Sequence, residues 1–172
     1  MPNNYILLET IALTQSAASV TFDNLPTSGY TDLKIVVSAR TDAALGVSNI
    51  SFNGVTTNLS SRILFAIGSG SPGSASYASN IRSGYIVGTS YTASTFSNNE
   101  IYIPNYRSSN NKSVSIDSVT ENNGTEAYSK IGAGLWSSTN AITSITLDVL
   151  NNATGTAANY VAGSTFSLYG VA

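Results

Sequence analysis

The chain has 172 residues, neither cysteine nor histidine, and a formal net charge of −2 from seven basic and nine acidic residues. The missing residue types exclude disulfides, cysteine nucleophiles, histidine-dependent triads and the zinc, haem or iron–sulfur sites that need those ligands. With fewer basic than acidic residues, the chain lacks the positive charge that binding to the phosphates of a nucleic acid requires. No run of residues reaches the ~18 apolar residues that a membrane-spanning helix needs. We therefore expect one domain over residues 1–172, with no cofactor, no nucleic-acid partner and no membrane partner.

Neutral polar residues dominate the composition, because serine, threonine and asparagine supply 28, 19 and 18 residues while only 9% of the chain is charged. Their side chains compete for backbone hydrogen bonds and so disfavour helices, and the branched threonine favours strands. Isoleucine, valine, leucine, phenylalanine and tyrosine nevertheless recur throughout, which argues against disorder. The composition indicates an all-β protein rich in turns.

Short alternating or dense apolar segments follow one another along the chain, separated by turn residues. They predict strands over residues 5–13, 19–25, 32–40, 62–67, 82–88, 94–103, 128–136, 144–149 and 165–169, with shorter ones around Ile50 and Phe52 and around Val114 and Ile116. The segment 1–4 is interpreted as an N-terminal arm, and the Gly/Ser-rich segment 68–76 as a flexible loop. The expected fold class is all-β, a single antiparallel β-sandwich or jelly roll of about eight to ten strands.

The alternation also predicts which side chains share a face and which of them are buried. In the strand ending at Trp136, the residues Ile131, Ala133 and Leu135 fall in step on one face. Elsewhere the pattern predicts burial of Phe22, Leu33, Ile35, Val37, Phe52, Ile101, Ile103, Ile145, Leu147, Phe166 and Leu168.

No residue pattern carries recognisable catalytic chemistry. The nine carboxylates are the remaining acid–base groups, and their linear spacing selects no pair for glycoside hydrolysis and no calcium loop. Ten tyrosines allow a second interpretation, in which Tyr77, Tyr85, Tyr91 and Tyr106 bind glycan on exposed rings; half-buried tyrosines on a sandwich surface remain the alternative. Arg40 is expected to pair with a carboxylate. We expect a protein that is not an enzyme and has no catalytic residues.

Several blocks, taken in order, resemble a β-sandwich domain found in structural proteins of tailed bacteriophages, in head decoration proteins and in fibre-like components. The blocks are Val20-Thr21-Phe22-Asp23-Asn24-Leu25-Pro26, Tyr30-Thr31-Asp32-Leu33 leading into Ser38-Ala39-Arg40, Ile50-Ser51-Phe52-Asn53-Gly54, Ile103-Pro104-Asn105-Tyr106, Leu135-Trp136 followed by residues 141–147, and Ser164-Thr165-Phe166-Ser167-Leu168-Tyr169-Gly170. The resemblance spans about 150 residues and attaches no catalytic or binding residue to these motifs.

The resemblance implies a non-enzymatic structural protein of the virion, made in the host cytoplasm without a signal peptide. Since the chain leaves no room for a stalk, a capsid decoration (cement) protein on the outer surface of the major capsid shell is favoured. The alternative is a tail-fibre or receptor-binding tip module that recognises host-surface glycan. The expected partners are the major capsid protein or another virion protein, and further copies of the chain in a homotrimer. The expected attachment residues are Met1, Pro2, Asn3, Asn4 and Tyr5.

Overall fold

The computed structural model describes residues 4–68, 70–121 and 126–172, and in these ranges it contains twelve strands and no helix. The strands are β1 (Tyr5–Ala12), β2 (Ser19–Phe22), β3 (Asp32–Ala39), β4 (Leu45–Phe52), β5 (Leu59–Ile67), β6 (Gly73–Tyr77), β7 (Ile81–Val87), β8 (Ser97–Ile103), β9 (Lys112–Thr120), β10 (Tyr128–Trp136), β11 (Ile145–Asn151) and β12 (Thr165–Val171). Within the described ranges, no helix has the length and apolar character needed to cross a bilayer.

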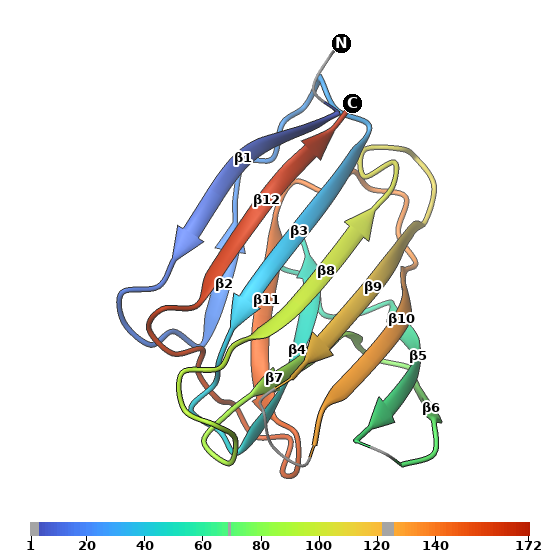
Figure 1. Ribbon diagram of the computed structural model, residues 1–172. Coiled ribbons are helices and arrows are strands. Elements are labelled where there is room, and N and C mark those ends of the chain that lie inside the picture. Colours follow the sequence, from blue (N-terminus) through green and yellow to red (C-terminus); the bar gives the residue numbers. More distant parts are fainter. Residues whose placement is uncertain (1–3, 69, 122–125) are drawn as a thin grey trace.

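Two antiparallel sheets pack face to face, so the predicted all-β sandwich is confirmed (Figure 1). The large sheet has eight strands in the order β1-β12-β3-β8-β9-β10-β5-β6, and the small sheet has four in the order β2-β11-β4-β7. Figure 1 shows the large sheet in front, with β5 and β6 along one side and the small sheet behind β12, β3, β8 and β9. The large sheet therefore extends beyond the last strand of the small one.

The number of strands exceeds the expected eight to ten, partly because the segment predicted as a loop contains β6. This strand starts at Gly73, inside the segment 68–76, and pairs with β5 from Phe65 to Ser61. A Cβ on Gly73 would lie 2.7 Å from the Phe65 ring, so the missing side chain allows this close pairing. The small residues of β6 gave no apolar alternation from which a strand could be predicted.

The hydrophobic core lies between the sheets, and all eleven residues predicted to be buried are buried. Phe22, Phe52, Ile145 and Leu147 line the inner face of the small sheet, while residues of β3, β8 and β12 meet them from the large sheet. Trp136 is also buried, with its ring centroid 5.5 Å from that of Phe52. Regular alternation thus identified the inner face correctly wherever the two sheets cover each other.

Strand β10 is the exception, because its apolar residues face outwards. Ile131 is 66% exposed and Leu135 37% exposed, whereas Lys130 is 2% exposed and Gly132 and Gly134 are buried. Ile131, Ala133 and Leu135, which the alternation places on one face, therefore share the outer face of the sheet. A Cβ on Gly134 would lie 2.6 Å from Ile81 Cγ2, so only glycine leaves room for β7 to pack here.

Strand β7 is an edge strand of the small sheet, and its free backbone groups are satisfied by side chains of the large sheet. The amides of Arg82, Tyr85 and Val87 donate to the hydroxyls of Ser61, Ser118 and Ser97, at 3.3, 3.2 and 2.8 Å respectively. In the opposite sense, the Lys130 ammonium donates to the carbonyl oxygen of Arg82 at 2.7 Å. Polar residues occupy this part of the inner face because a strand edge, unlike a strand face, presents donors and acceptors.

Candidate functional site

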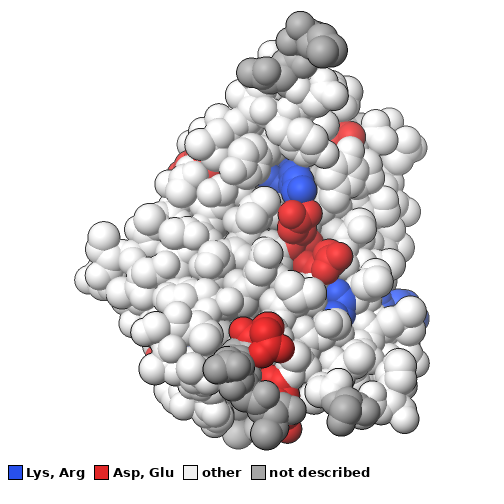
Figure 2. Space-filling view, in the orientation of Figure 1, with Lys and Arg blue, Asp and Glu red and all other residues white. Residues whose placement is uncertain are grey.

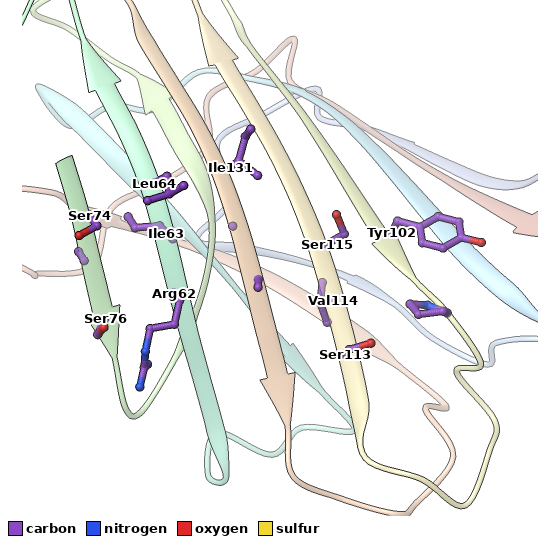
Figure 3. A pocket seen from close by; sticks show the side chains of 14 residues that line it. Arg62, Ile63, Leu64, Ser74, Ser76, Tyr102, Ser113, Val114, Ser115 and Ile131 are labelled. Carbon is purple, nitrogen blue, oxygen red and sulfur yellow. The ribbon is translucent and has the colours of Figure 1, made fainter. Parts of the chain in front are cut away.

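The outer face of the large sheet carries a shallow groove of about 660 Å³ on the side formed by β5, β6, β9 and β10 (Figure 3). Leu64 and Ile131 are cross-strand partners in β5 and β10, and they are 63% and 66% exposed. Figure 3 shows them side by side at one end of the groove, with Arg62 and Ser113 toward the other end. Two large aliphatic side chains thus form the centre of an exposed surface instead of a core.

Serine and alanine residues lie near this aliphatic pair, together with the longer side chains of Arg62 and Tyr102. One cross-strand row contains, from β6 to β8, Ser76, Arg62, Ala133, Ser115 and Tyr102. Val119 and Leu135, on β9 and β10, are further exposed apolar residues on the outer face of the large sheet. A contiguous apolar patch of this kind on a soluble domain marks an interaction site more often than it marks ordinary surface.

The groove continues across the sheet toward β1. Tyr102 and Ser115 line both this groove and a smaller hollow of about 140 Å³, which Tyr5 and Lys34 line from the other side. The hydroxyl of Tyr102 donates to the Asp32 carboxylate, and this hydrogen bond, together with burial, raises the pKa of Tyr102 to about 12. Tyr102 is therefore a neutral, fixed ring at neutral pH, and it connects the two hollows.

Several charged side chains on this face gather in a narrow band (Figure 2), and Arg62 adds a positive charge within the groove itself. Lys34 forms an ion pair with Glu100, with 2.7 Å between Nζ and Oε2. Glu100 is also the direct cross-strand partner of Asp117 in β9. Two carboxylates placed opposite each other destabilise a sheet, and one lysine balances only one of them. The band therefore has a net negative charge beside the apolar groove.

The four tyrosines named for glycan binding do not form one exposed surface. Tyr106 is fully buried and donates from its hydroxyl to the carbonyl oxygen of Pro26. Tyr85 is 8% exposed, and its ring packs against Tyr128 with the centroids 4.9 Å apart. Tyr91 also contacts Tyr128, through a hydroxyl hydrogen bond of 2.9 Å. Tyr106 therefore lies in the core and cannot present a ring, whereas Tyr77, Tyr85 and Tyr91 gather near the edge of the sandwich.

The expected N-terminal attachment residues are described in part. Met1, Pro2 and Asn3 lie outside the described residues, and Asn4 is exposed. Tyr5 is 53% exposed at the start of β1, with the Lys34 ammonium 5.6 Å from its ring centroid. Tyr5 consequently belongs to the same outer face as the groove, a connection that the sequence did not reveal.

Arg40 has a structural role that differs from the expected pairing with a carboxylate. Its guanidinium donates to the carbonyl oxygens of Gly88, Tyr91, Thr92 and Thr95 at 2.6 to 3.2 Å. It therefore holds the 88–95 loop against the end of β3. Carbonyl acceptors of this kind come from the folded loop and leave no charge pattern in the sequence.

The groove residues Leu64 and Ile131 were not identified from the sequence as surface residues. The available signal was the alternation of Ile131, Ala133 and Leu135 with Lys130, Gly132 and Gly134, which places the three apolar residues on one face without indicating whether that face points inward or outward. Among the described residues, no three Asp or Glu side chains are grouped in a way that could hold a metal ion.

Comparisons with protein-family models, with curated proteins and with solved structures found no match to this chain. The interpretation of the site therefore rests on the residues of the chain itself and on the geometry of its outer face.

Proposed function

We propose that this chain is a non-enzymatic structural protein of a phage particle, a decoration protein that docks on the outer surface of the major capsid shell. The observation that carries the proposal is the exposed pair Leu64 and Ile131 at one end of the outer groove. Burying two such side chains against a partner contributes about 1.5–3 kcal/mol each. The phage setting comes from the sequence resemblance, and the docking mode comes from the groove.

The chemistry of the groove favours a protein partner over a glycan. Sugars are recognised by aromatic platforms and by dense hydrogen-bonding groups, whereas the groove has an exposed aliphatic pair at one end and is lined elsewhere mostly by serine, alanine and other small or aliphatic residues, with Arg62 as the one charged residue among the described residues that line it. Tyr102 is the aromatic residue of the groove, and its hydroxyl is already engaged by Asp32. The alternative of a glycan-binding fibre tip therefore has weaker support from this face.

The charge band adds a specific expectation about the partner. Glu100 and Asp117 carry two negative charges against the single positive charge of Lys34. A partner surface with an apolar ridge and a lysine or arginine beside it would match the groove and the band together. We expect the interaction to weaken with salt through the charge band, while the apolar part is insensitive to salt.

The test is the number of copies on purified particles of the phage that encodes this chain, measured by quantitative mass spectrometry against the major capsid protein. A decoration protein is expected in hundreds of copies per particle. A handful of copies would favour the fibre tip, and absence from purified particles would overturn the virion role.

A variant pair locates the docking face. Ile131→Lys places a charge in the exposed aliphatic pair of the groove and is expected to reduce occupancy on particles at least tenfold. Ala141→Lys is the matched control, because Ala141 is exposed and lies away from the groove, in the segment between β10 and β11. Equal occupancy for the two variants would show that another face attaches the protein. Sedimentation of the parent chain as a trimer or as a monomer tests the proposed homotrimer separately.

A further inference from the structure

Two positive side chains meet at the edge of the sandwich, on the opposite side of β5 and β10 from the groove. Lys130 in β10 is 2% exposed, and its ammonium donates to the carbonyl oxygen of Arg82 in β7 at 2.7 Å. The Arg82 guanidinium is half-buried and stacks on the Tyr77 ring, with Cζ 4.4 Å from the centroid. Strand β7 is the last strand of the small sheet and lies beneath β10 here, so the partly exposed side chains of Arg82 and Tyr77 are the groups at this corner that solvent reaches.

The Arg82 side chain has a hydrogen-bond donor without an acceptor. Its Nε is buried and has no partner among the described residues. Arg40 provides the contrast within the same chain, since four carbonyl oxygens accept hydrogen bonds from its guanidinium. A buried guanidinium nitrogen without an acceptor is costly, and an acceptor from outside the chain would remove that cost.

The charges of this corner are also uncompensated. The one ion pair between described residues joins Lys34 and Glu100, so neither Lys130 nor Arg82 has a carboxylate partner among them. Burial, together with the positive charge of Arg82, lowers the pKa of Lys130 to about 7. The rings of Tyr77 and Tyr85 lie next to the two cations, with Arg82 Cζ 4.4 Å from the Tyr77 centroid and Lys130 Nζ 5.6 Å from the Tyr85 centroid.

We propose that the corner formed by Arg82, Lys130, Tyr77 and Tyr85 binds an oxyanion, a carboxylate or phosphate group carried by a ligand from outside the chain. Arginine presents a planar fork of donors that matches both groups, and the lysine supplies a second positive charge close by. The aromatic rings provide apolar walls that exclude water and strengthen the electrostatic attraction. This site is separate from the docking groove and does not depend on the proposed attachment to a shell.

The test is calorimetric titration of the full chain at pH 6.5 with four probes at constant ionic strength. Sodium acetate and inorganic phosphate report the two anion chemistries, and glucuronate with neutral glucose reports an acidic sugar. We expect at least one anion to bind with a measurable heat and glucose to give none. Tighter binding of glucuronate than of acetate would assign an acidic sugar as the source of the carboxylate, and preference for phosphate would assign a phosphate group.

Arg82→Gln is expected to weaken anion binding at least tenfold. Arg107→Gln is the matched control, because Arg107 is exposed on the loop after β8, with its Cζ 5.9 Å from the centroid of the Tyr106 ring, away from the proposed site. A second measurement remains valid if Arg82→Gln folds poorly. In the parent chain labelled with ¹³C-lysine, anion binding should raise the pKa of Lys130, whose signal is assigned with Lys130→Met.

Two results would overturn the proposal. The first is the absence of any heat or lysine shift with all three anions beyond that caused by sodium chloride. The second is equal anion affinity in the parent chain and in a folded Arg82→Gln variant, which would place the anion elsewhere.

Discussion

The two halves of the large sheet pack against different surfaces. In β12, β3 and the second half of β8, aliphatic and aromatic side chains alternate inward against the second sheet, and Leu33, Ile35 and Phe166 are fully buried. In β10 and β5 the inward positions include Lys130, Gly134 and Ser61, while Ile131 and Leu64 face outward. The first half follows the usual apolar-in pattern, and the second half reverses part of it.

The reversal follows from what each half packs against. A sheet face offers side chains and is matched by aliphatic groups, whereas the edge of β7 offers amides and carbonyl oxygens. Ser61 and Lys130 satisfy these groups, and Gly134 gives Ile81 the room to approach. The aliphatic residues of β10 are then left outside, where they form the groove. One packing requirement therefore accounts for both the polar inner corner and the exposed apolar face.

The largest expected effect lies in the covered half. Phe166→Ala removes a fully buried ring that packs edge-on against Tyr160 at 4.9 Å, and it should cost about 3–5 kcal/mol of unfolding free energy. Chemical denaturation followed by circular dichroism measures the loss. A loss below about 1 kcal/mol would mean that Phe166 does not anchor the core as described.

A glycine pair tests the close approach of β7. Gly134→Ala places a Cβ 2.6 Å from Ile81 Cγ2 and should cost about 1–3 kcal/mol through overpacking. Gly132→Ala, two residues earlier on the same inner face, meets its nearest atoms at 3.4 Å and should be neutral or stabilising by about 0.5 kcal/mol. Thermal unfolding of both variants makes the comparison, and equal melting temperatures would contradict the described packing.

The buried lysine predicts a pH dependence of stability. Since the folded state lowers the pKa of Lys130 from 10.5 to about 7, the unfolded chain binds more protons between these values. Stability should therefore rise as the pH increases from about 7 towards 10.5, and below about 7, where both states bind the proton, this contribution should no longer change with pH. Lys130→Met should flatten this rise in urea denaturation series. A parent chain with the same slope as the variant would show that Lys130 titrates normally.

The smallest expected effect lies in the groove. Ile131→Thr and Leu64→Thr replace side chains that are more than 60% exposed, so each should change the unfolding free energy by less than about 0.5 kcal/mol. Ile116→Thr is the matched substitution on the inner face of the neighbouring strand, where the isoleucine is 1% exposed, and it should be far more destabilising. Similar losses for Ile131→Thr and Ile116→Thr would mean that Ile131 is covered in solution.

The sequence by itself determined the class of the fold and most of its core. Alternation of apolar residues in β3, β11 and β12 identified the inward side chains, because a strand between two complete sheets leaves only one face for apolar burial. The abundance of serine, threonine and asparagine likewise pointed to strands and turns. These signals are local, and they can be recognised without knowing which strands pair.

Only the tertiary structure decided the orientation of β10, the existence of β6 and the position of both candidate sites. The apolar residues Ile131 and Leu64 meet across strands 67 residues apart in the chain, and Arg82 meets Lys130 because β7 ends the small sheet beneath β10. Pairing order and the extent of each sheet are long-range properties that no alternation within one strand encodes. The face of β10 depended on the strand edge packed against it, and that edge is defined only once the sheets have assembled.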